Sequence, residues 1–285
     1  MVRKRLFYRV ATPLVAMTIA LVPALADKPQ DNGDGGFSSD NACQTLPGYN
    51  ALKSALVSAV GAETSGLNMN MWATIVDRDG VVCAVAFSGV NRGAQWPGSR
   101  AISAQKANTA NAFSLDSSSA SNSSGAAAGL ALSTANLYSA VQPGGSLYGL
   151  QASNPVDTDV AYEGPSQSYG TSGDPMVGEK IGGVNVFGGG LALYGTGQKV
   201  LGGLGVSGDT SCADHMIAWR VRHTLGLDHL LGVGGVNSTD LSRPDNIIYD
   251  ITANPNGGTG KSAGGFGHPT CINTGDQTAL PAVQK

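Results

Sequence analysis

The apolar positions of the chain predict four helices and two β-hairpins. Apolar residues recur at helical spacing in four segments, 49–65, 100–115, 126–138 and 211–225. β-rich runs joined by short turns occur in two places, 69–76 with 81–87 and 184–194 with 199–206. We expect Ser99 to cap the second helix, because its hydroxyl can accept a hydrogen bond from a free backbone N–H group. The order of these elements predicts an α+β fold, an antiparallel β-sheet flanked by helices.

The first 26 residues have the composition of a secretory signal peptide. A basic start is followed by an apolar run at 12–22 and by the small-residue sequence Ala24-Leu25-Ala26. That run is shorter than the ~20 residues that a membrane span needs, so a signal peptide is favoured over an anchor. We therefore expect an exported protein, periplasmic or secreted, whose mature chain begins at Asp27 and has no integral membrane segment.

The remaining sequence divides into three predicted parts. We expect a flexible leader at 27–46, a ligand-binding domain at 47–226, and a glycine-rich extension at 227–285 that packs on the domain. The whole chain contains 41 glycines, which favour tight turns and close packing. The net charge is −3, and removing the four basic residues of the signal segment lowers it to −7. An acidic protein repels phosphate backbones, which argues against nucleic acid as a partner.

Four cysteines in an exported chain predict disulfides. None of their spacings fits a CxxC metal or redox site. Three pairings can be drawn, and the sequence does not choose among them. We favour Cys43 with Cys271 and Cys83 with Cys212, because the first pair flanks the predicted domain and would hold leader and tail together.

One face of the predicted helix 100–115 carries two polar residues among apolar ones. At 100° per residue, Lys106 and Thr109 share this face with Ile102 and Phe113. Lys106 could extend from the edge of the stripe towards water while Thr109 bonds to the preceding turn. Alternatively, the stripe lines a pocket in which Lys106 pairs with a ligand carboxylate. The second interpretation predicts that replacing Lys106 weakens ligand binding and hardly changes stability.

The last predicted helix has an unusual outer face. Its inner face holds Asp214 with apolar residues, while the other face holds His215, Trp219, Arg222 and His223. That face is either solvated or part of a subunit interface or ligand site. His268, near Cys271, could be a ligand or a surface residue, and we favour a surface residue. No Gly-x-Ser-x-Gly motif occurs, so the sequence gives little support to nucleophilic catalysis.

These motifs together resemble the GlcG/HbpS family of haem-binding proteins. The resemblance lies in the run from Ile102 to Phe113 with its Lys-Ala-x-Thr-Ala motif, the Gly-Gly pair at 182–183, and the Gly-Val-Ser-Gly strand that leads to Asp214. It implies a profilin-like layered α+β domain, often oligomeric, that in some members binds haem or iron. Asn185 replaces the proline of the family pattern, the segment 144–178 is enlarged, and the tail has no counterpart.

The resemblance implies an exported protein that binds haem, or a related iron or tetrapyrrole ligand, and that could form homo-oligomers. The expected cofactor-binding residues are Lys106, Thr109, Phe113, Asp214 and His215. Three histidines, His215, His223 and His268, are candidates for the iron ligand, and the sequence does not choose among them. Two alternatives stand beside it: an enzyme that acts on a small organic acid with Lys106 as acid or base, and a structural or interaction protein without a ligand.

Overall fold

The computed structural model describes residues 43–118, 128–236, 242–258 and 260–285. The predicted signal peptide and most of the predicted leader lie outside these residues. Three helices are longer than two turns: α1 (Tyr49–Ala62), α2 (Ser99–Phe113) and α4 (Ser211–Thr224). The four main strands are β1 (Trp72–Asp77), β2 (Val82–Phe87), β3 (Gly190–Gly195) and β4 (Lys199–Ser207). A short helix α3 (Thr158–Ala161) and a two-residue strand pair, β5 (Ile251–Thr252) with β6 (Lys261–Ser262), follow the irregular segments. None of the helices in the described part of the chain is long and apolar enough to cross a membrane.

The four main strands form one antiparallel sheet in the order β2-β1-β4-β3. Each predicted hairpin is present, and the pairing of β1 with β4 joins the two hairpins into one sheet. The predicted α+β fold is confirmed. The second hairpin begins at Gly190, later than predicted, because residues 184–189 run as coil before the strand.

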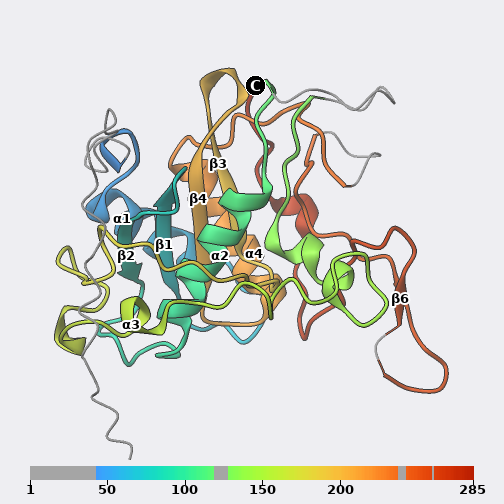
Figure 1. The fold of residues 1–285 in the computed structure, drawn as a ribbon, viewed down its shortest axis with the longest axis horizontal. Helices are drawn as coiled ribbons and strands as arrows, with labels where there is room; N and C mark the ends of the chain where they lie inside the picture. The colour runs from blue at the N-terminus through green and yellow to red at the C-terminus, as the bar shows by residue number, and fades with distance from the viewer. Residues whose placement is uncertain (1–42, 119–127, 237–241, 259) are drawn as a thin grey trace, which may run out of the picture. The chain divides into compact units, whose positions relative to one another are not determined.

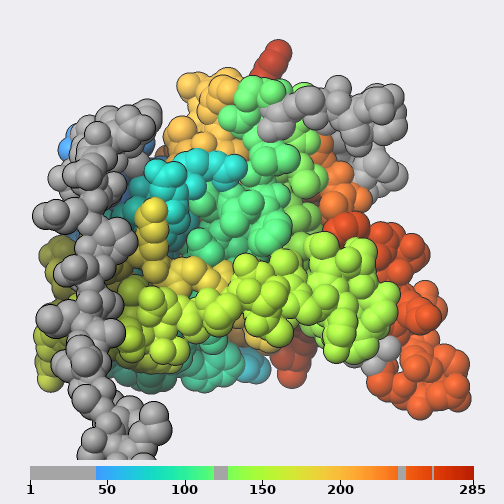
Figure 2. Space-filling view, in the orientation of Figure 1, coloured from blue at the N-terminus to red at the C-terminus, as the bar shows by residue number. Residues whose placement is uncertain are grey.

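Helices cover both faces of this sheet (Figure 1). Side chains alternate along β1: Ile75 joins the core shared with α1 and α4, whereas Val76 joins the cluster under α2. The enlarged segment 144–178 lies over the α2 side of the molecule (Figure 2). Arg100 of α2 fixes it there through a buried ion pair with Asp174. The irregular segment is therefore an integral part of the α2 layer.

Two glycines of β4 allow helix α2 to pack closely on the sheet. A Cβ atom built on Gly203 would overlap the carbonyl oxygen of Ala107, and one built on Gly205 would overlap that of Ser103. Both oxygens belong to the backbone of α2. The sheet can therefore come close to α2 only where β4 has no side chain on that face.

Two of the helix predictions are wrong in detail. Gly98, not Ser99, is the N-cap of α2, and Ser99 is already helical. The helix predicted at 126–138 is replaced, in its described part, by one 3₁₀ turn at Thr134–Leu137, and a second follows at Ser139–Val141. This segment supplies Leu132 and Leu137 to a small apolar cluster, and its tertiary packing overrides a weak helical pattern.

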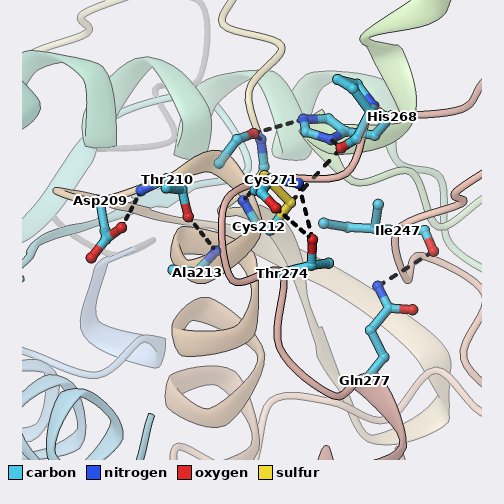
Figure 3. Close-up of a disulfide and its surroundings, with 12 residues drawn as sticks. Asp209, Thr210, Cys212, Ala213, Ile247, His268, Cys271, Thr274 and Gln277 are labelled. Atoms are coloured by element: carbon cyan, nitrogen blue, oxygen red, sulfur yellow. Dashed lines mark hydrogen bonds between the residues drawn. A yellow bond between two sulfur atoms is a disulfide. The ribbon is translucent and has the colours of Figure 1, made fainter. Parts of the chain in front are cut away.

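The favoured disulfide pairing is wrong. The structure joins Cys43 to Cys83 and Cys212 to Cys271. The first bond fixes the segment before α1 to β2, and the second fixes the tail to the first turn of α4 (Figure 3). Each bond thus links neighbouring layers, and neither connects leader with tail.

The tail covers the outer face of α4, which the sequence left open as a solvated or contact surface. Trp219 Nε1 donates to the carbonyl oxygen of Pro281 at 2.9 Å, and Arg222 forms a buried ion pair with Asp245 at 2.5 Å. Trp219 and Arg222 are almost fully buried, whereas His223 is partly exposed and pairs with Asp228. The partner of this face is the chain's own C-terminal segment.

Candidate functional site

A buried ion pair joins α2 to the start of α4. Lys106 Nζ lies 2.7 Å from Asp214 Oδ2 and donates a second hydrogen bond to the carbonyl oxygen of Val206 at 3.1 Å. Asp214 Oδ1 accepts from the backbone N–H groups of Gly208 and Asp209. The carboxylate that Lys106 binds therefore belongs to the protein itself.

Burial acts on both members of this pair. It raises the pKa of Asp214 to about 6, against the opposing effects of Lys106 and of the Asp209 backbone N–H. It also lowers the pKa of Lys106, and Asp214 opposes this shift. Each charge is stabilised by the other, so removing either one leaves a buried charge without its counterion.

A cavity of about 290 Å³ opens where the start of α2, the end of β4 and the start of α4 meet. Lys106, Asp214, Ser211, Ile102, Trp96 and Phe187 are among the residues that line it. Trp96 is 47% exposed and Phe187 is 48% exposed. The cavity thus combines two half-exposed aromatic rings with a buried ion pair, a mixture of apolar and precisely bonded polar groups that is common in ligand sites.

Three of the predicted site residues lie away from this cavity. Thr109 donates to the carbonyl oxygen of Gln105 at 2.7 Å, as the local interpretation predicted. It also accepts from the backbone N–H of Asn185 at 3.0 Å. A proline at position 185 would lack that N–H, so the departure from the family pattern has a structural role here. Phe113 packs in the apolar cluster with Leu132.

His215 is fully buried against the tail. No hydrogen bond of ordinary geometry reaches either ring nitrogen, although the side chain of Asn246 interacts with the imidazole. Burial, with a further effect of Arg222, lowers the pKa of His215 to about 3. The ring is therefore neutral. It is not among the residues that line the cavity, so the structure brings together only Lys106 and Asp214 of the five predicted binding residues.

The sequence interpretation of His268 as a surface residue is wrong. Its side chain is buried, and its Nε2 lies 2.7 Å from Ser211 Oγ at the cavity. The Cys212–Cys271 disulfide holds the tail beside the N-terminus of α4, and Figure 3 shows His268 close to this bond. Only the nearness of Cys271 in the sequence hinted at this position. The sequence separation of 57 between Ser211 and His268 hides the contact from any local motif.

The fold and the cavity define a layered α+β domain with a small ligand-sized site at one end of its sheet. The chain belongs to the family described as haem degrading protein HbpS-like, whose model matches residues 50–222. The match ends inside α4, so the tail and His268 lie beyond it.

Three solved structures are among those similar to this chain. Klebsiella pneumoniae protein ORFY is 23% identical, with 61% of this chain and 88% of that chain covered and a TM-score of 0.38. A PduOC:heme complex is 23% identical, covering 61% and 89%, with a TM-score of 0.38. HbpS is 14% identical, covering 70% and 97%, with a TM-score of 0.38. No curated protein gives a significant match.

Proposed function

We propose that this chain binds haem, or a closely related tetrapyrrole, at the mouth of the 290 Å³ cavity. Membership of the HbpS-like family supports the class of ligand. The observation that carries the proposal is the pair of half-exposed rings, Trp96 and Phe187, at one cavity. A flat apolar macrocycle would remove both rings from water, which is favourable in proportion to the apolar area covered.

The residues present fit the macrocycle better than they fit its iron. Trp96, Ile102 and Phe187 would hold the ring by apolar contact. The described residues that line the cavity include no His, Cys, Met or Tyr, the usual protein ligands of haem iron, so we assign no iron ligand. His223 lines a different cavity, between α1 and α4. When bound, haem would supply iron-centred redox or oxygen chemistry.

Haem titration tests this proposal. Truncating Trp96 or Phe187 to alanine should weaken haem binding about tenfold each, because a stacked aromatic contact contributes roughly 1 to 1.5 kcal/mol. Binding is followed by the growth of a Soret band in the purified mature chain. Tyr148→Ala, at an aromatic residue that is 69% exposed elsewhere, is the matched control and should bind as wild type does. Equal affinities in all four proteins, or no Soret band in wild type, would reject the site.

We also propose that the chain is exported to the periplasm or secreted. The signal-like sequence before Asp27 supports this, as do the disulfides that pair all four cysteines, because such bonds persist in oxidising compartments. Expression in a secreting host should yield a protein whose intact mass begins at Asp27. A soluble intracellular pool that retains Met1 would contradict export.

A further inference from the structure

Ser211, which lines the cavity, forms a hydrogen bond with His268. Ser211 Oγ lies 2.7 Å from His268 Nε2, and His268 Nδ1 lies 2.6 Å from the carbonyl oxygen of Pro269. A carbonyl oxygen can only accept, so Nδ1 carries the proton in the neutral ring. Nε2 is then the acceptor, and Ser211 Oγ donates to it. This is the arrangement of a nucleophile with its general base, the base being oriented by a third group.

The surroundings keep His268 in its basic form and in place. Its side chain is only 2% exposed, and burial lowers its pKa, so the ring is neutral at neutral pH. The ring also contacts Tyr138, with ring centroids 5.0 Å apart. The neighbouring Cys212–Cys271 disulfide restricts the loop that carries it (Figure 3). The imidazole is therefore held in position before any substrate arrives.

Ser211 is placed where an attacking oxygen would be useful. It is partly exposed, lines the cavity, and is the first residue of α4, after the Thr210 cap. The N-terminus of a 14-residue helix carries a partial positive charge that stabilises negative charge developing nearby. The backbone N–H of Gly188 donates to Ser211 Oγ at 2.6 Å and so fixes the position of the hydroxyl oxygen.

We propose that Ser211 and His268 are the nucleophile and the general base of a carboxylic-ester hydrolase site. Ser211 Oγ forms a bond to the ester carbonyl carbon as the C=O π electrons move onto the carbonyl oxygen, and the Ser211 proton passes to His268 Nε2. The C=O bond then re-forms as the carbon–oxygen bond to the alcohol breaks, and the alcohol takes that proton. Water attacks the acyl-serine with His268 again accepting a proton, the acid leaves, and the proton returns to Ser211.

The cavity limits the substrate class. Its volume of about 290 Å³ admits a short acyl group, and the rings of Trp96 and Phe187 favour an apolar one. The charge of Lys106 is balanced by Asp214, and the carboxylate of Asp209 adds a further negative charge to the lining. Short-chain neutral or cationic esters are therefore expected, and anionic esters are disfavoured.

Covalent labelling tests the nucleophile in the unmodified protein. The mature oxidised chain is treated with a fluorophosphonate probe at neutral pH, digested, and mapped by mass spectrometry. The adduct is expected on Ser211, with several-fold slower labelling in His268→Gln because the general base is lost. Folded wild type that carries no adduct on Ser211, or that is labelled mainly on other serines, would overturn the proposal.

Turnover of p-nitrophenyl acetate and butyrate tests the dyad as a unit. Ser211→Ala and His268→Gln should each lower kcat/KM at least about 100-fold, and the double variant should be no worse than either one. Ser114→Ala is the matched control: the Ser114 hydroxyl also donates one hydrogen bond and accepts one, both with Leu132, but is not bonded to histidine. It should keep wild-type turnover.

The outcomes separate this activity from haem binding. Circular dichroism and thermal unfolding establish that each variant is folded, and the wild-type labelling result stands even where a variant is not. Turnover that persists in folded Ser211→Ala would reject the dyad. Soret titration of the same variants reports on haem independently, so haem binding can fail while hydrolysis is found, or the reverse.

Discussion

Replacing Gly205 with alanine is expected to lower the free energy of unfolding by more than about 3 kcal/mol, or to prevent folding. The added Cβ would overlap the carbonyl oxygen of Ser103 and lie 2.6 Å from the backbone nitrogen of Ala107. Both are backbone atoms of α2, held by the helix, so no side-chain rotation can make room. Overpacking by one methyl group usually costs roughly 1 to 3 kcal/mol, and rigid backbone neighbours place this site above that range.

Urea unfolding followed by circular dichroism measures the effect. Gly61→Ala is the matched control, because Gly61 lies inside α1 and nothing lies within 4 Å of its added Cβ. That variant should be stabilised by about 0.5 to 1 kcal/mol, since alanine favours the helix. A Gly205→Ala protein as stable as wild type would show that α2 does not pack as closely on β4 as described.

Replacing Lys106 with alanine is expected to cost about 3 to 5 kcal/mol of stability, because it leaves the Asp214 carboxylate buried without its counterion. The pocket interpretation of the sequence predicted weaker ligand binding with stability hardly changed, whereas the buried contact with Asp214 leads us to expect a loss of stability. Lys199→Ala is the matched control. Lys199 pairs with Asp116 at 3.4 Å at the surface, where such a pair contributes about 0 to 1 kcal/mol.

The loss at Lys106 should depend on pH. Lys106 lowers the pKa of Asp214, which burial raises to about 6, so without Lys106 the folded-state pKa rises further. A carboxyl whose folded pKa is raised stabilises the fold at low pH and loses that contribution as pH rises through the folded pKa. The difference between wild type and Lys106→Ala should therefore be larger at pH 8 than at pH 5. A difference independent of pH would mean that Asp214 is not the group left unpaired.

The local part of this fold could be predicted from sequence, and the non-local part could not. The hairpins and α1, α2 and α4 follow from periodicity over a few residues, which is a property of each segment alone. The angular position of Lys106 correctly placed it on the apolar face of its helix. Its partner Asp214 is 108 residues away, and nothing in either helix encodes that contact.

The non-local nature of these contacts also explains why the disulfide pairing and the burial of His268 were predicted wrongly. Disulfide pairing depends on which layers meet, and Cys83 on β2 meets Cys43 only because the segment before α1 packs beside that strand. The tail has few apolar residues, so its sequence does not show that it buries His215 and Trp219. It does so with four scattered apolar residues, Leu230, Val233, Leu280 and Val283, and with polar groups such as Asp245 and the carbonyl oxygen of Pro281.

The tail's cover over α4 also bears on how copies of this chain could assemble. A segment tethered to the surface that it covers competes at an effective concentration of about millimolar, and the Cys212–Cys271 bond shortens the tether. A second copy at micromolar concentration is therefore at a disadvantage against the tail at Trp219 and Arg222. We expect any homo-oligomer to use surfaces other than this covered face of α4.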